Sequence, residues 1–267
     1  MNASEALTKY TWIGYASFRS SMAYISEVAT RCVFMAVVLF IFAQLWTAAY
    51  ASAGSRVGDL TLPQMLWYLT IAESIQLSAY RVATEVDEDV RTGRLSIQLL
   101  RPVSYTFARM AQAIGERVVR FALNLGVGSI VVWFLVGPIR ITAIGALMFV
   151  VALPIAFAID FLGNFAVGLG AFWMESTVGL QIAYSRMSML LGGLMMPIDV
   201  FPVAVQPILR ALPFAGIMYG PARLFVTGDP SVFRFTMVSQ TGALAVFGAI
   251  VWVIQHAAMR RIQNHGG

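Results

Sequence analysis

Uninterrupted apolar stretches about as long as a bilayer is thick are the feature that most constrains how this chain folds. The first, "CVFMAVVLFIFAQLWTAAY" at residues 32–50, contains no charged residue, and several later stretches approach its length. A transmembrane helix needs about 20 apolar residues. Only 12% of the 267 residues are charged, too few to shield this much apolar surface from water. The sequence therefore predicts an all-α, polytopic membrane protein with six transmembrane helices, at residues 32–50, 60–80, 118–137, 139–171, 177–196 and 236–258.

Three segments need an interpretation of their own. Residues 141–171 stay apolar for 31 residues, which corresponds to about 46 Å of helix, so we expect one long helix kinked at Pro154. Residues 1–31 suit an amphipathic helix in the membrane interface, with a partly ordered soluble segment as the alternative. Residues 197–231 contain six prolines and predict short helices that dip into the outer leaflet rather than one long helix.

The distribution of basic residues predicts the orientation in the membrane. With six spans, both termini lie on the same side. Twelve of the 18 lysines and arginines fall on that side and five on the other, with Arg186 inside a span. Because cytoplasmic connections carry the excess of basic residues, we expect both termini and residues 81–117 in the cytoplasm, at the inner membrane of a prokaryote.

The sequence argues against several kinds of site. The single lysine, Lys9, lies outside any glycine-rich phosphate-binding loop, so we expect no nucleotide site of the P-loop type. One cysteine, Cys32, excludes a disulfide framework, and two histidines without metal-binding spacing make a metal site improbable. The positive-inside rule accounts for the net charge of +5 without a nucleic-acid partner. We therefore expect no catalytic residue, metal or cofactor in this chain. We expect membrane lipid to surround its apolar helices.

The segment 81–117 is expected to begin with a short charged helix. Its acids precede its arginines, an order that complements the helix dipole. Gly93 can supply the left-handed residue that ends the helix. The alternative is a solvated loop whose charges serve only the membrane topology. Topology would explain the arginines, but it would not explain four acids. We therefore expect a docking helix for a soluble partner, built from Glu85, Asp87, Glu88, Asp89, Arg91, Gly93 and Arg94.

Two stretches resemble the ABC-2 type exporter permeases. "VRTGRLSIQLLRPVSY", at 90–105, is similar to the cytoplasmic signature of that family, a Gly-x-Leu followed by Leu-Leu-Arg-Pro-Val-Ser. "GGLMMPIDVFPVAVQPILRALPFAGIMYGPARLFVTG", at 192–228, is similar to its outer-face pattern before the last span. The stretches occur in the expected order and on the expected sides, and the resemblance covers nearly the whole chain.

The resemblance implies a transmembrane permease subunit of an ATP-driven exporter. Such subunits pair with an identical copy or with a related permease, and two soluble ATPase subunits, which carry ATP and magnesium, bind below them. The first cytoplasmic connection serves as the coupling helix; here it would be Glu85 to Arg94. We expect a related second permease rather than an identical copy. The dense acids at 85–89 suggest a basic rim on the ATPase partner.

Three ionisable residues lie within the expected spans and away from their ends: Glu73, Asp160 and Arg186. Charges inside a membrane are unfavourable unless they face protein or water. We expect these residues to line the translocation path or a dimer interface, with Arg186 paired to an acid. The structural alternative is that Arg186 reaches the cytoplasm and that Asp160 lies at the inner end of a long helix.

Two other functional classes stay open from the sequence. One is a membrane transporter or scaffold that works without an ATPase. The other is an intramembrane enzyme that uses Asp160 and Glu73, for which two acids in spans are the whole support. Aromatic and methionine-rich spans fit an amphiphilic cargo as well as ordinary packing, so the sequence does not identify the substrate.

Overall fold

The structure is a computed structural model that describes residues 3–23, 25–54 and 56–265. Within these ranges, side chains are not described at residues 3–6, 25–29, 31–32, 53 and 261–265. The side chain of Cys32, and residues 1–2 and 24 of the expected interfacial segment, therefore lie outside the described residues.

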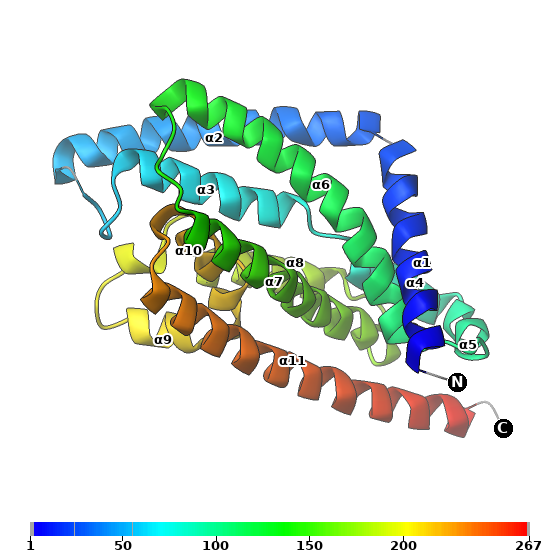
Figure 1. Cartoon of the computed structure of the whole chain (residues 1–267). Coiled ribbons are helices and arrows are strands. Elements are labelled where there is room, and N and C mark those ends of the chain that lie inside the picture. The colour runs from blue at the N-terminus through cyan, green and yellow to red at the C-terminus, as the bar shows by residue number, and fades with distance from the viewer. Residues whose placement is uncertain (1–2, 24, 55, 266–267) are drawn as a thin grey trace.

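The described residues form helices joined by short connections (Figure 1). The only β-type pairing among them is an isolated bridge between Val57 and Leu60. In chain order the elements are α1 (Ala3–Ala23), α2 (Ile25–Ala53), α3 (Leu62–Leu77), α4 (Val82–Arg91), α5 (Arg94–Leu99), α6 (Tyr105–Val136), α7 (Ala143–Leu169), η1 (Gly170–Phe172), α8 (Val178–Leu191), η2 (Ile198–Val200), α9 (Gln206–Ala211), η3 (Pro213–Gly216), α10 (Tyr219–Thr227) and α11 (Pro230–His265).

Among the residues that the structure describes, four helices are long and apolar enough to cross a membrane, in the ranges Val33–Ser52, Tyr105–Val136, Ala143–Phe172 and Pro230–Arg260. The expected spans at 60–80 and 177–196 form the shorter helices α3 and α8, of 16 and 14 residues. At 1.5 Å per residue these extend only about 24 Å and 21 Å, less than the roughly 30 Å of a hydrocarbon core. The all-α fold is thus confirmed, with four strongly apolar candidate spans.

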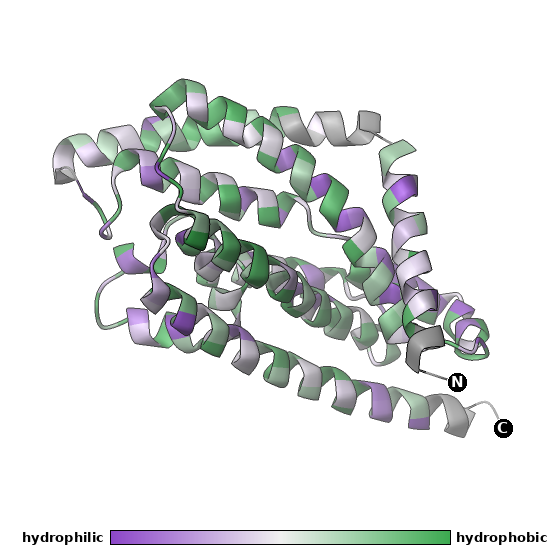
Figure 2. Cartoon of the chain, in the orientation of Figure 1, coloured by the Kyte–Doolittle hydropathy of each residue, from purple (hydrophilic) through white to green (hydrophobic). Residues whose placement is uncertain are grey.

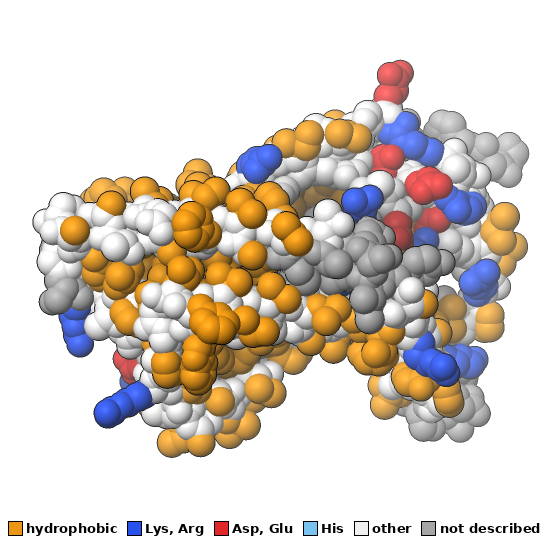
Figure 3. Space-filling model, turned by 90° about the horizontal axis from the view of Figure 1, so that it is seen from above, with side chains coloured by type: hydrophobic (Ala, Val, Ile, Leu, Met, Phe, Trp, Pro, Cys, Tyr) orange, Lys and Arg blue, Asp and Glu red, His pale blue; other side chains and the backbone are white. Residues whose placement is uncertain are grey.

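The bundle has two distinct ends. Both described chain termini, α4 and α5 lie at one end, which we call the termini end (Figure 1). The opposite end holds α9 and the connections between α2 and α3 and between α6 and α7. Hydrophobic residues dominate the middle of the long helices (Figure 2), and charged side chains gather mainly toward the termini end (Figure 3).

Helix α3 forms the centre of the core. It packs against α2, α6 and α10, and eleven of its residues are buried. A glycine lets α2, α3 and α6 approach closely: a Cβ at Gly128 of α6 would lie 2.3 Å from Met35 Cε and 2.8 Å from Thr70 Cγ2. Because α3 is enclosed by protein, polar residues on it face other helices rather than lipid.

Several helix boundaries differ from the expectation. Helix α6 begins at Tyr105 and not at 118, so the last part of the expected connection 81–117 belongs to a 32-residue helix. No proline lies between Ser104 and Gly137, and the charges at the start of α6 find partners, so they do not end the helix. Helix α2 begins at Ile25 rather than 32, and α11 at Pro230 rather than 236. The long apolar stretch forms the single helix α7 with Pro154 inside it.

Candidate functional site

Helix α4 packs one face onto the end of α7. Val82, Ala83 and Val86 are buried, and their spacing places them on one side of the helix. The contact depends on Gly168 of α7, where a Cβ would lie 2.7 Å from Val86 Cβ and 2.8 Å from the Ala83 carbonyl oxygen. The absence of a side chain at this position lets the two backbones meet. Close packing on α7 therefore sets which face of α4 points into the protein.

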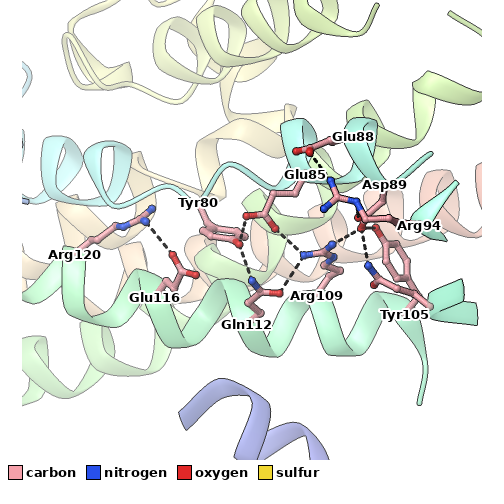
Figure 4. Close-up of polar contacts among 11 residues, drawn as sticks. Tyr80, Glu85, Glu88, Asp89, Arg94, Tyr105, Arg109, Gln112, Glu116 and Arg120 are labelled. Carbon is pink, nitrogen blue, oxygen red and sulfur yellow. Dashed lines mark hydrogen bonds and ion pairs between the residues drawn. The ribbon is translucent and has the colours of Figure 1, made fainter. Parts of the chain in front are cut away.

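Two acids of α4 bind an arginine of α6 (Figure 4). Arg109 donates to a carboxylate oxygen of Glu85 at 2.7 Å and also pairs with Asp89. The Asp89 side chain is only 3% exposed, and it accepts further hydrogen bonds from Tyr105 Oη at 2.7 Å and from Gln98 Nε2 at 3.2 Å. A buried charge persists when it is paired and hydrogen-bonded in this way. The arrangement fixes α4 to the first turns of α6.

A tyrosine extends this network toward α3. Tyr80, which precedes α4, donates its hydroxyl proton to Glu85 and accepts a hydrogen bond from Gln112 Nε2 at 2.9 Å. Burial raises the pKa of the Tyr80 hydroxyl above its usual value, and the hydrogen bond to the Glu85 carboxylate raises this pKa further. Tyr80 therefore stays a neutral donor over the physiological pH range. We call Tyr80, Glu85, Asp89, Tyr105, Arg109 and Gln112 the α4–α6 cluster (Figure 4).

Helix α4 also packs on η1 and makes polar contacts with α8. Asp87 accepts a hydrogen bond from Thr177 Oγ1 at 2.8 Å, and Thr177 is the N-cap residue of α8. Thr84 Oγ1 donates to Gln181 Oε1 at 3.0 Å. Burial raises the pKa of the Asp87 carboxyl, but hydrogen bonds from Arg91 and Thr177 together outweigh it, so this pKa lies below its usual value. Helix α4 is thus attached to α6, α7 and α8.

The other face of α4 is open. Glu88, Arg91 and Arg94 have side chains that are 60%, 39% and 51% exposed, and Glu88 forms an ion pair with Arg94. Gly93 separates α4 from α5 with a φ of 71°, the left-handed conformation expected of it. The next helix, α5, was not expected, and it presents Ile97 and the adjacent Leu100 to the surroundings.

The structure divides the acids of the expected docking helix by their exposure. Of its four acids, Glu88 is exposed, Asp89 is buried, and Glu85 and Asp87 are partly buried. Sequence reasoning assigned all four to a soluble partner and missed Tyr105 and Arg109 as their internal partners. A signal was present: Glu85 and Asp89 are four residues apart and border the apolar positions of α4, so they share its inward side.

Asp160 lies in a second buried network, which joins α3, α6 and α7. Arg117 of α6 donates to Asp160 at 2.6 Å, and both side chains are less than 10% exposed. Arg117 also donates to the Ile75 carbonyl oxygen at 3.0 Å and stacks over Phe157, with its guanidinium carbon 4.2 Å from the ring centroid. Sequence reasoning counted Arg117 as a charge flanking a span and did not see it as the partner of Asp160.

The other two intramembrane candidates are not joined to this pair. Glu73 is buried in α3, and no hydrogen bond or ion pair links it to another described residue. Arg186 is exposed on α8, and its one described contact is with Met189 Sδ at 3.8 Å. Among the described residues no acid pairs with Arg186, so the expected pairing stays a prediction. The place of Arg186 in an apolar sequence could not show which way the side chain points.

A third polar network lies at the opposite end of the bundle, and the sequence did not reveal it. Asp199 accepts hydrogen bonds from Arg210 at 2.7 Å and from Tyr219 Oη at 2.9 and 3.0 Å, and it pairs with Arg223. These four residues form the Asp199 cluster. They border a cavity of about 250 Å³ beside the start of α11. All four come from residues 197–231, so the cluster closes this segment onto itself.

Long apolar helices with charged clusters at both ends define a multi-pass helical membrane protein. The chain belongs to the ABC-2 family of transporter proteins: the family model described as "ABC-2 family transporter protein" matches residues 32–266. The resemblance seen in the sequence is thereby confirmed. Members of this family are transmembrane components rather than nucleotide-binding domains, and in general they work with ATPase partners. No curated protein matches the chain.

Proposed function

We propose that the chain is the permease subunit of an ATP-driven exporter. In this proposal two soluble ATPase subunits, with their ATP and magnesium, bind at the termini end. That end faces the cytoplasm, and the membrane is the inner membrane of a prokaryote. Helices α3 and α8 are the two shorter of six spans, and residues 197–231 lie in the outer leaflet.

The observation that carries the proposal is the two-sided character of α4. One face is attached to three helices of the bundle, through Arg109, Gly168 and Thr177. The other face presents the charges of Glu88 and Arg91, and Arg94 at the start of α5 pairs with Glu88. A rigid element attached in this way passes a displacement to every helix that it contacts, because packed interfaces rearrange as units.

The coupling residues then divide into two groups. The ATPase is contacted by Glu88, Arg91 and Arg94. Ile97 of α5 and the adjacent Leu100 contact it as well. Glu85, Asp87 and Asp89 transmit the displacement into the membrane helices, and Gly93 sets the angle between α4 and α5. Because the exposed charges are of both signs, the ATPase surface that receives them carries both signs as well, rather than the purely basic rim that four outward acids would require.

A photo-crosslinking amino acid at single positions tests this assignment. A crosslinker at position 88 should capture the ATPase subunit when the two proteins are expressed together. Position 140 is the matched control, because Arg140 is an exposed charged residue at the opposite end. Capture at 140 and not at 88 would contradict the proposed orientation. No capture at either position, with transport that continues without any ATPase, would favour an ATPase-independent transporter or a scaffold.

We further propose that Glu73 and Arg186 line the translocation path or the interface with a second permease. Asp160 acts there through Arg117, which holds α3, α6 and α7 together. The second permease is a related subunit rather than an identical copy. A subunit count of the purified complex tests that point, and two identical permease chains per complex would contradict it.

A further inference from the structure

One face of α8 carries a single charge in an otherwise apolar surface. Arg186 is exposed, and Ile182 and Leu190, one turn before and one turn after it, are exposed as well, at 56% and 54%. Tyr184 and Ser188 lie on the other side of the helix and are buried against the bundle. Arg186 is the ninth of the 14 residues of α8, about 12 Å along the axis from its start. In the proposed arrangement of six spans α8 crosses the membrane, and this position then places Arg186 within the apolar layer.

The guanidinium of Arg186 is left almost without partners. It has five N–H donors, and its one described contact is the weak acceptor Met189 Sδ. An arginine in hydrocarbon is strongly unfavourable unless water, protein or an anion covers it. The neighbouring Ile182 and Leu190 offer no polar atom that could do this. Something outside the described residues of this chain must therefore face Arg186.

A second copy of this chain does not provide an acid for it on the described surface of its spans. The side chain of Glu27, near the start of α2, lies outside the described residues, and the other acids within α2, α3, α6, α7, α8 and α11 are Glu73, Glu116 and Asp160. Glu73 and Asp160 are buried, and Glu116 is only 17% exposed and pairs with Arg120. Two copies brought together at α8 would place two arginines on one apolar surface, which an anion can neutralise.

We propose that Arg186 and the apolar face around it bind an anionic amphiphile as the transported substrate. The planar guanidinium matches a carboxylate or a phosphate through two parallel hydrogen bonds. The exposed side chains of Ile182, Met187 and Leu190 contact the apolar part of the same molecule. This inference names the substrate class of the proposed exporter and rests on that proposal.

Binding to the purified chain in a neutral detergent tests the inference without any ATPase. Hexadecyl phosphate, hexadecanoate, hexadecanol and hexadecyltrimethylammonium have the same chain and differ in their head groups. Native mass spectrometry measures how each one binds to the wild type. We expect the two anions to bind at least about tenfold more tightly than the alcohol.

Three variants assign that preference to the residue. Arg186→Gln should bind all four amphiphiles alike. Arg186→Lys should keep part of the preference for anions, because lysine retains the positive charge but lacks the planar pair of N–H donors of a guanidinium. Arg140→Gln is the control, an exposed arginine removed at the opposite end, and it should behave as the wild type. Each variant is first shown to elute as one species in size-exclusion chromatography, which separates a binding defect from misfolding.

Two results would overturn the proposal: equal binding of the alcohol and the anions by the wild type, or an anion preference that survives in Arg186→Gln. An ion pair between Arg186 and a carboxylate of a neighbouring permease in the assembled complex would overturn it as well. These results are distinct from a failure of the proposed function, which shows itself as an ATPase that does not contact position 88.

Discussion

The α4–α6 cluster and the Asp199 cluster use the same chemistry at the two ends of the bundle. Each centres on a carboxylate that is less than 10% exposed, bound by arginine and by a tyrosine hydroxyl. They differ in what they join. The Asp199 cluster links positions within one segment, 199 to 223, whereas the α4–α6 cluster links a helix with an open charged face to a long membrane helix.

The contribution of a buried ion pair to stability therefore does not show what role the pair plays. A closed cluster holds a proline-rich segment in shape, and its loss costs stability. Loss of a cluster that joins the proposed coupling helix α4 to a membrane helix also lowers stability. In addition, it breaks the contacts through which a displacement of α4 would reach that helix. The two roles can be separated by comparing stability with coupling in matched variants.

The largest loss of stability is expected for Asp199→Asn. This change leaves Arg210 and Arg223 without their shared carboxylate, and removing one partner of a buried pair typically costs about 3–5 kcal/mol. The thermal unfolding midpoint in detergent measures the effect. The ATPase activity stimulated by the permease should stay at the wild-type level wherever the variant is folded. A folded variant that no longer stimulates the ATPase would remove the distinction between the two clusters.

A smaller loss of stability, about 2–3 kcal/mol, is expected for Asp89→Asn, because Glu85 still neutralises Arg109. Here the stimulated ATPase activity should fall severalfold although the ATPase still binds. Glu88→Gln is the matched control, an exposed acid one residue away whose removal should leave the unfolding midpoint unchanged. Normal stimulation in Asp89→Asn would show that the cluster plays a purely structural part.

The packing of α4 on α7 is tested by Gly168→Ala. The added methyl group would press against Val86 and the backbone at Ala83, and such overpacking costs about 1–3 kcal/mol. The control is Gly126→Ala on α6, where no atom lies within 4 Å of the new Cβ. Alanine is the better helix former, so the control should be neutral or slightly stabilising. Equal unfolding midpoints in the two variants would contradict the close contact.

The smallest effect concerns pH and the link between α4 and α8. The pKa of the folded Asp87 carboxyl is lowered, so its stabilisation is present above the unfolded value, near pH 4, and is lost as pH falls through the folded pKa. The difference in unfolding midpoint between the wild type and Asp87→Asn should therefore shrink below about pH 4. A difference that stays constant from pH 6 to pH 3 would show that Asp87 contributes without its charge.

The sequence predicted the features that depend on local chemistry. Apolar length identified the four long spans, and Gly93 ended α4 in the left-handed conformation that glycine permits. What it could not predict was the rotation of α4 about its own axis. That rotation depends on the contact with Gly168, 75 residues further along the chain from Gly93, and it decides which acids point inward.

The same limit applies to pairs that are distant in sequence. Arg117 and Asp160 lie 43 residues apart, and only the fold brings them together. Arg109 and Arg117 were assigned to a connection rather than a helix, because their partners come from other elements of the fold. For Arg186 the expected acid is not found among the described residues, and its pairing stays a prediction.

The central claim is that ATP-driven displacement enters the membrane helices through the inward contacts of α4. The most direct measurement is ATP hydrolysis by the assembled complex for Asp89→Asn and Asp199→Asn, at a temperature at which both are folded. Stimulation should fall severalfold in Asp89→Asn and be retained in Asp199→Asn, although Asp199→Asn is the less stable variant. Stimulation retained in Asp89→Asn, or lost equally in both, would contradict the central claim.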